Sequence, residues 1–64
     1  MTLNDLRQVT TSSVEVSVWS IDRDGDLHEV TSGRFRELPS EVLEAEVTWI
    51  EAIDADCIDV TIGG

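Results

Sequence analysis

The sequence predicts an α+β fold in which four antiparallel strands form one sheet and two short helices cover one of its faces. Two stretches, residues 14–31 and 46–62, alternate between apolar and polar residues as half-buried strands do. A cluster of turn-forming residues interrupts each stretch, as in a β-hairpin. A short segment with helical spacing of apolar residues precedes each hairpin. The predicted element order is therefore α-β-β-α-β-β, within a single domain over residues 1–64.

The first helix is expected over residues 1–9. Thr2 is a suitable N-cap, and Asp5 three residues later completes a weak capping box. The apolar residues recur at three-residue spacing and form one stripe: Leu3, Leu6 and Val9. Two helical turns are too short to be stable alone, so the stripe is expected to pack on the sheet. The polar residues 10–13 then form the loop into the first strand.

The first hairpin is expected to turn at Asp24 and Gly25, which suit a two-residue type I′ turn. Before the turn, alternate residues separate onto two faces, Val14, Val16 and Val18 on one and Glu15, Ser17, Trp19 and Ile21 on the other. Counting outward from the turn predicts four cross-strand pairs: Glu15 with Arg34, Trp19 with Val30, Ile21 with His28 and Val14 with Phe35. Gly33 indicates a bulge or a close backbone approach in the second strand.

A second helix is expected over residues 39–46, because Pro39 suits a first helical turn. Glu41 and Glu44 would face outward, and Leu38, Val42 and Leu43 inward. The second hairpin turns at residues 54–56 and places two sets of residues on opposite faces: Ile58, Val60 and Ile62, and Cys57, Asp59 and Thr61. Residues 63–64 read as a tail. The pattern leaves open which strands of the two hairpins are neighbours.

Acidic charge is the strongest global feature of the sequence. Fourteen Asp and Glu residues oppose four arginines, there is no lysine, and the formal net charge is -10. Such a surface repels nucleic acid and anionic membranes, and it favours basic protein surfaces or divalent cations. The alternative is that the acids only keep the protein soluble. No apolar run approaches the roughly 20 residues of a membrane span, and no secretory signal is visible, so a cytoplasmic location is expected.

The residue types argue against an enzyme, a cofactor or a metal centre. One cysteine, Cys57, and one histidine, His28, cannot build a zinc site, which needs about four such ligands. No nucleophile pair or phosphate-binding glycine pattern is visible. Asp22, Asp24 and Asp26 alternate as calcium ligands do, with Glu29 downstream, but their spacing does not match an EF-hand. A solvated hairpin turn is the preferred interpretation, with a calcium module as a third class of function.

Trp19 falls on the strand face that the helices leave open. An exposed aromatic side chain among acids is typical of a protein-binding anchor, although sheet curvature or a long neighbour would also cover it. The predicted partner-binding residues therefore combine this tryptophan with the acids of the turns and of the second helix: Trp19, Asp22, Asp24, Asp26, Glu29, Glu41, Glu44, Asp54 and Asp56.

Four segments carry a resemblance to small acidic proteins of phages, prophages and bacterial mobile elements: residues 2–6, 22–25, 38–43 and 58–62. The resemblance implies the helix-hairpin-helix-hairpin layout and brings no catalytic residues. Compact acidic proteins from such sources include inhibitors of host defence, anti-CRISPR proteins among them, some of which present carboxylates in place of nucleic-acid phosphates. The predicted function is accordingly a non-enzymatic protein that masks a basic, nucleic-acid-binding surface of a larger host protein, such as a CRISPR-Cas effector, without contacting nucleic acid or membrane directly. The alternative is an assembly protein that forms a homodimer through an open sheet face or edge.

Overall fold

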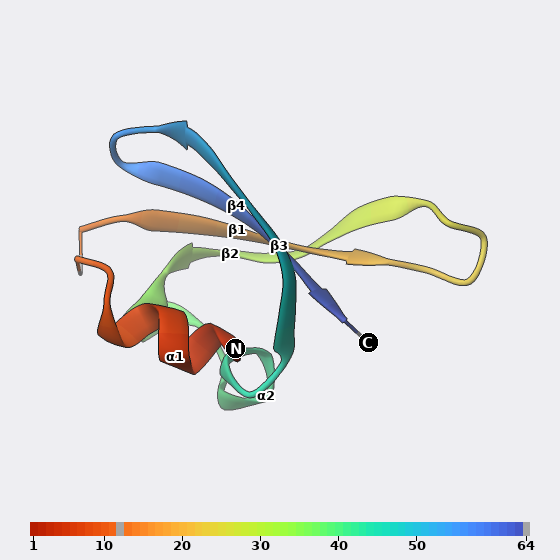
Figure 1. Cartoon of the computed structure of the whole chain (residues 1–64), viewed down its shortest axis with the longest axis horizontal. Coiled ribbons are helices and arrows are strands. Elements are labelled where there is room, and N and C mark those ends of the chain that lie inside the picture. The colour runs from red at the N-terminus through yellow and green to blue at the C-terminus, as the bar shows by residue number, and fades with distance from the viewer. Residues whose placement is uncertain (12, 64) are drawn as a thin grey trace.

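The computed structural model describes residues 1–11 and 13–63 and has an α+β architecture (Figure 1). Its elements follow in chain order: α1 (Leu3–Gln8), β1 (Glu15–Ile21), β2 (Leu27–Arg34), the 3-10 helix η1 (Phe35–Glu37), α2 (Ser40–Leu43), β3 (Glu46–Asp54) and β4 (Cys57–Gly63). The predicted fold class and element order are confirmed, with η1 added. Ser12 of the predicted loop and Gly64 of the predicted tail lie outside the described residues, and Gly63 belongs to β4. Within the described part, no helix has the length and apolar character to cross a membrane.

The four strands form one mixed sheet in the order β2-β1-β4-β3. Each hairpin is antiparallel, but the two central strands, β1 and β4, are parallel, so the prediction of a fully antiparallel sheet is wrong. The reason lies in the connection from β2 to β3. This segment crosses the helical face of the sheet and returns the chain to the end where β2 began, so that β2 and β3 run in the same direction along opposite edges.

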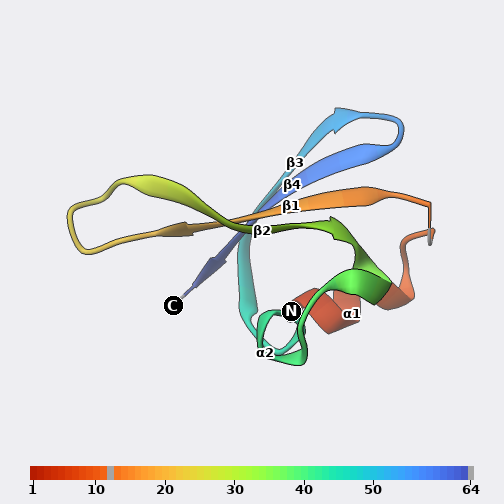
Figure 2. The same cartoon turned by 180° about the vertical axis from the view of Figure 1, so that it is seen from behind.

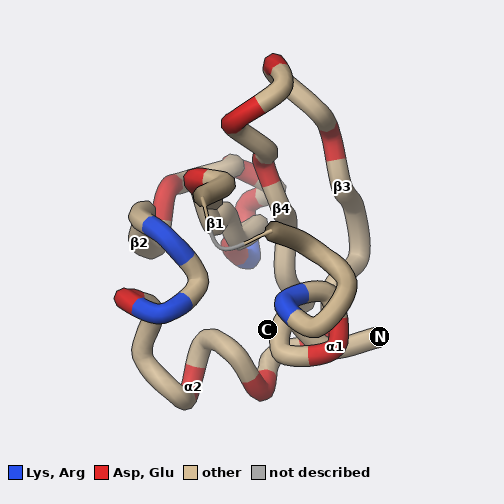
Figure 3. The backbone as a smooth tube through the Cα atoms, turned by 90° about the vertical axis from the view of Figure 1, so that its left-hand side faces the viewer, with Lys and Arg blue, Asp and Glu red and all other residues tan. Residues whose placement is uncertain are grey.

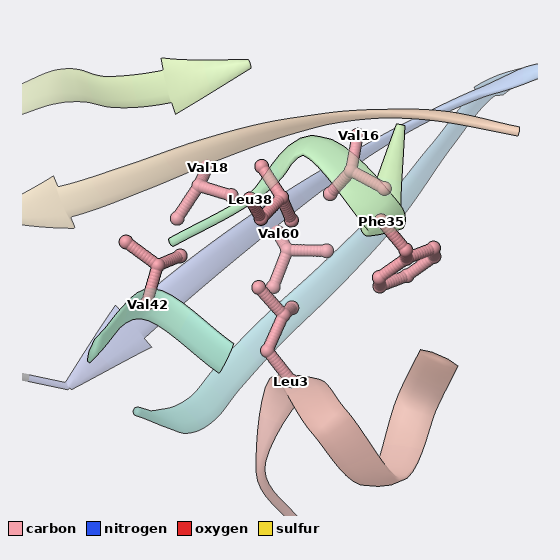
Figure 4. Close-up of a cluster of buried hydrophobic side chains, with 7 residues drawn as sticks. All are labelled: Leu3, Val16, Val18, Phe35, Leu38, Val42 and Val60. Carbon is pink, nitrogen blue, oxygen red and sulfur yellow. The ribbon is translucent and has the colours of Figure 1, made fainter. Parts of the chain in front are cut away.

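The hydrophobic core lies between the sheet and the helices (Figure 4). Val16 and Val18 of β1 and Val60 of β4 point to this side and are completely buried. Leu3 of α1 is also completely buried, and the crossing segment adds three buried side chains: Phe35, Leu38 and Val42. The alternation of the central strands therefore decides the inner face, as the sequence predicts.

The two helices are shorter than predicted. The capping box of α1 is present, because the N–H of Asp5 donates to Thr2 Oγ1 at 3.2 Å and the N–H of Thr2 donates to Asp5 Oδ2 at 2.9 Å. However, Val9 is the C-cap residue and is 81% exposed, so the predicted apolar stripe ends one turn earlier. Helix α2 ends at Leu43, three residues before the predicted end, because Glu46 already begins β3.

The first hairpin has a three-residue loop where a two-residue turn is predicted. The N–H of Asp22 donates to the carbonyl oxygen of Asp26 at 3.0 Å, and Gly25 takes a positive φ of 84°. Near the loop, the register is therefore displaced by one residue from the prediction. Trp19 lies opposite Glu29 and Ile21 opposite Leu27.

A compensating register shift between Val18 and Trp19 restores the predicted pairing farther from the loop, and the predicted pair of Glu15 with Arg34 is confirmed. The pair of Val14 with Phe35 is wrong, because both residues lie outside the strands. The shift is not at Gly33, which instead adopts a positive φ of 140°.

Candidate binding face

The side of the sheet turned away from the core carries no helix (Figure 2). Reading across β2, β1, β4 and β3, the residues on this side form three rows. The rows are Arg34, Glu15, Cys57 and Asp54; Ser32, Ser17, Asp59 and Glu51; and Glu29, Trp19, Thr61 and Trp49. We call these residues the open face. Strand alternation places them here, because their neighbours on β1 and β4 point into the core.

Negative charge dominates the open face. Five of its residues are acidic, namely Glu15, Glu29, Glu51, Asp54 and Asp59, and one, Arg34, is basic. Figure 3 shows acidic positions along β3, β4 and the turn between them. In residues 1–11 and 13–63, the ion pair found within 4.0 Å joins the Met1 amino group to Glu46 Oε2 at 3.2 Å. Within the described residues, the carboxylates of the open face therefore form no close ion pair, although Arg34 lies opposite Glu15.

Two tryptophans lie in the third row on either side of Thr61. Trp49, on the edge strand, is 65% exposed, whereas Trp19, on an inner strand, is half-buried. The indole N–H of Trp19 is buried without a hydrogen-bond partner. Trp19 is thus neither fully exposed, as a binding anchor would be, nor fully covered. Trp49 is the more accessible of the two aromatic side chains.

A shallow hollow of about 660 Å³ lies at the end of the open face where β1 and β4 begin. Its lining joins the start of β1, the end of β2 and the β3–β4 turn: Ser13, Glu15, Arg34, Asp54, Ala55, Asp56 and Cys57. Partial burial raises the pKa of the Cys57 thiol above its ordinary value of 9.0, and the nearby carboxylates of Asp54, Asp59 and Glu15 raise it further. The thiol therefore stays protonated near neutral pH, which disfavours its use as a nucleophile.

Both hairpins project beyond the helices as arms that point in different directions (Figure 1). Every residue is exposed in the first arm, residues 21–30, and in the second arm, residues 48–56. Six large apolar side chains of these arms are exposed: Ile21, Leu27, Val30, Trp49, Ile50 and Ile53. Exposed large apolar side chains on each arm make both arms candidates for contact with another molecule.

The acids singled out from the sequence fall in three separate places. Asp22, Asp24 and Asp26 lie at the tip of the first arm, where their carboxylate oxygens approach within 4.8 Å of one another. There, Asp22 Oδ1 accepts hydrogen bonds from the N–H groups of Asp24 at 2.9 Å and Asp26 at 3.0 Å. These contacts fold the loop and require no ion.

The remaining predicted residues divide between the two sides of the sheet. Asp54 and Asp56 lie at the tip of the second arm, at the opposite end of the sheet from the first tip. Glu41 lies on α2 and Glu44 at its C-cap, on the helical side. The structure brings three of the predicted residues onto the open face, namely Trp19, Glu29 and Asp54.

Four residues of the open face are not among the predicted binding residues: Glu15, Glu51, Asp59 and Trp49. Alternation had already assigned two of them, Glu15 and Asp59, to a strand face. What was missing was the parallel pairing of β1 with β4, which joins those faces into one surface. In addition, His28 lies in the first arm and Cys57 at the other end of the sheet, so the fold does not bring these two together.

Comparison with known proteins gives no match, whether with family models, curated proteins or solved structures. The geometry and charge of the open face are therefore the basis for a functional proposal.

Proposed function

We propose that this protein is a non-enzymatic binding protein whose open face attaches to a basic surface of a larger protein. The supporting observation is the concentration of five unpaired carboxylates and two tryptophans on a helix-free sheet face that holds one arginine. A face of this composition repels polyanions and attracts arginine- and lysine-rich surfaces.

The two kinds of side chain have different roles in this proposal. Long-range attraction between the carboxylates and the partner speeds association, and this effect weakens as salt screens the charges. Trp49 supplies exposed aromatic area next to Glu51, and aromatic residues are enriched among the residues that dominate interface energies. An arginine of the partner gains from both, because a guanidinium stacks on an indole ring as well as pairing with a carboxylate.

The class of partner follows from the same charges. Basic surfaces of the required extent are common on proteins that bind nucleic acid. We therefore propose that the partner is a nucleic-acid-binding protein of the cytoplasm, such as a defence effector, and that the open face masks its binding site. In that case the partner, once bound, loses its affinity for DNA or RNA.

Two matched double variants test the open face. Glu15→Gln with Asp59→Asn neutralises two of its central acids, and Glu41→Gln with Glu44→Gln makes the same change in net charge on the helical side. In a pull-down from a lysate at low salt, a partner of the open face is retained by the wild type and by the α2 double variant. The open-face double variant should bind that partner at least tenfold more weakly.

The proposal is overturned if both double variants retain every captured protein equally, or if capture is unchanged in half-molar salt. A competition measurement tests the masking. Addition of the protein to the partner loaded with labelled nucleic acid should release the label, and a stable ternary complex would contradict this part of the proposal.

The exposed apolar side chains of the arms also favour a second candidate, a homodimer. Charge opposes a homodimer that forms through the open face, because the two faces together carry ten carboxylates and two arginines. Sedimentation velocity at micromolar concentration and pH 7 separates the candidates. A dimer that persists in low salt would replace the proposed function, and a monomer removes the second candidate.

A further inference from the structure

The edge strand β3 already pairs with a segment outside its own hairpin. Thr2 forms an antiparallel bridge with Glu46. The N–H of Val47 donates to the carbonyl oxygen of Met1 at 2.8 Å, and the N–H of Leu3 donates to the carbonyl oxygen of Ala45 at 3.1 Å. The outer edge of β3 therefore already forms backbone hydrogen bonds at the start of the strand. Beyond Val47, the N-terminal segment no longer covers this edge within the described residues.

The uncovered part of this edge is regular and accessible. Trp49–Ala52 pairs with β4 without interruption between two register shifts, one after Val47 and one before Asp54. Every residue from Thr48 to Asp54 is exposed. Ile50 is 41% exposed although it points to the helical side of the sheet. A strand added here would therefore find space on both faces.

The side chains of this stretch select a particular kind of strand. Glu51 and Asp54 point to the open face, and β3 has no basic residue. Ile50 offers an apolar contact on the other side. Cross-strand pairs of opposite charge and pairs of apolar residues are favourable, whereas like charges directly opposite each other are destabilising. A second copy of β3 would bring only further acidic charge to this edge, because the strand has no basic residue.

We propose that Trp49–Ala52 of β3 accepts an extended basic segment of the partner as a fifth, antiparallel strand. The segment places arginine or lysine side chains on the open-face side, near Glu51, and aliphatic side chains beside Ile50. The backbone hydrogen bonds of the added segment provide affinity, and its alternating basic and aliphatic side chains provide specificity, as in other cases of strand addition. This inference rests on the proposed function, because it specifies which part of the partner the acidic surface recognises.

A synthetic peptide tests the edge. The probe is an eight-residue peptide of alternating arginine and valine, acetylated and amidated at its ends, so that it has four amides of each kind. Two isomers carry N-methyl groups, one on the arginine amides and one on the valine amides. Successive residues of a strand direct their N–H groups to opposite edges, so one isomer blocks pairing with β3 and the other leaves it intact. Both keep the same charge.

We expect the two N-methylated isomers to differ at least tenfold in affinity by calorimetry at low salt. Amide exchange followed by NMR should also slow within residues 48–54 when the unmethylated peptide binds. Glu51→Gln should weaken this peptide severalfold, and Glu41→Gln, on α2, should leave its affinity unchanged.

The outcomes separate the two proposals. If both isomers bind equally and the peptide perturbs Glu15 and Asp59 without protecting β3 amides, the edge pairing is overturned and the proposed function stands. If the unmethylated peptide fails to bind at low salt, both the edge pairing and the attraction of the open face for basic segments are overturned.

Discussion

Cys57 shows how the sheet register controls the chemistry of a single side chain. Its row on the open face places Glu15 on one side and Asp54 on the other, and Asp59 follows two residues later on the same strand. Partial burial and these carboxylates disfavour the thiolate, which is the reactive form of cysteine. The raised pKa of the thiol therefore predicts slow alkylation at slightly alkaline pH.

Removal of one neighbouring charge should increase this reactivity. We expect Asp54→Asn to raise the rate of Cys57 alkylation by iodoacetamide at pH 8 by about two- to fivefold, as a short-range charge interaction across water would. Asp56→Asn is the control, since Asp56 lies in the same turn but does not contribute to the raised pKa. Equal rates for the wild type and both variants would contradict this explanation.

Among the elements, α1 shows that equal spacing in sequence does not mean equal burial. Leu3 is completely buried, whereas Val9 is 81% exposed at the C-cap. We expect Leu3→Ala to lower the free energy of unfolding by about 2–5 kcal/mol, because it leaves a cavity in the core. Val9→Ala should change it by less than about 0.5 kcal/mol. Urea unfolding followed by circular dichroism measures both, and similar losses would show that α1 packs differently.

The N-terminus of α1 also gives stability a pH dependence. Hydrogen bonds from the backbone and side chain of Thr2 hold the pKa of the Asp5 carboxyl below its ordinary value of 3.8. Because the folded-state pKa is the lower one, the stabilisation is fully present above pH 3.8 and is lost as the pH falls through the folded-state pKa.

Asp5→Asn should therefore be less stable than the wild type at pH 6, and the difference should shrink below pH 3.8. Urea unfolding at several pH values checks this. A constant difference down to pH 2 would contradict it.

Local features of this fold could be predicted from the sequence, and the arrangement of the hairpins could not. The capping box of α1, the two hairpins and the inner face of β1 each depend on residues close together in the chain. The loop at Gly25 has one residue more than the Asp-Gly pair predicts. The register shift after Val18 compensates for this difference, so the strand pairing far from the loop agrees with the prediction.

The parallel contact of β1 with β4 has no local signal, because the same alternation suits either direction of pairing. For this reason the sequence indicated the tips of the hairpins as the acidic site and missed the surface between them. The acids at the tips were visible as clusters, whereas Glu15, Glu51 and Asp59 become neighbours through the fold.

For the whole molecule, net charge and the exposed arms act against each other. At pH 7 a formal charge of -10 keeps copies apart, although the arms expose apolar side chains. The isoelectric point is about 4.1, so this repulsion disappears as the pH falls toward that value. We expect a monomer at pH 7 and reversible association near pH 4.5 at the same ionic strength, measured by sedimentation velocity.

Ile53→Ser, in the second arm, should reduce this association, whereas Thr11→Ser, outside the arms, should not. Association of equal strength at both pH values would show that charge does not keep the copies apart.

The parallel ladder at the centre of the sheet also has a consequence for how the chain reaches this shape. Glu15 pairs with Cys57, about 40 positions later, whereas both hairpins join residues close together. Closing so long a span costs entropy before any contact compensates for it. We therefore expect the hairpins to form early and separately, and the pairing of β1 with β4 to be the slow step. Before β1 and β4 pair, Val16, Val18 and Val60 are exposed to water. The rate of this pairing therefore determines how long a newly synthesised chain can aggregate or pair its strands wrongly.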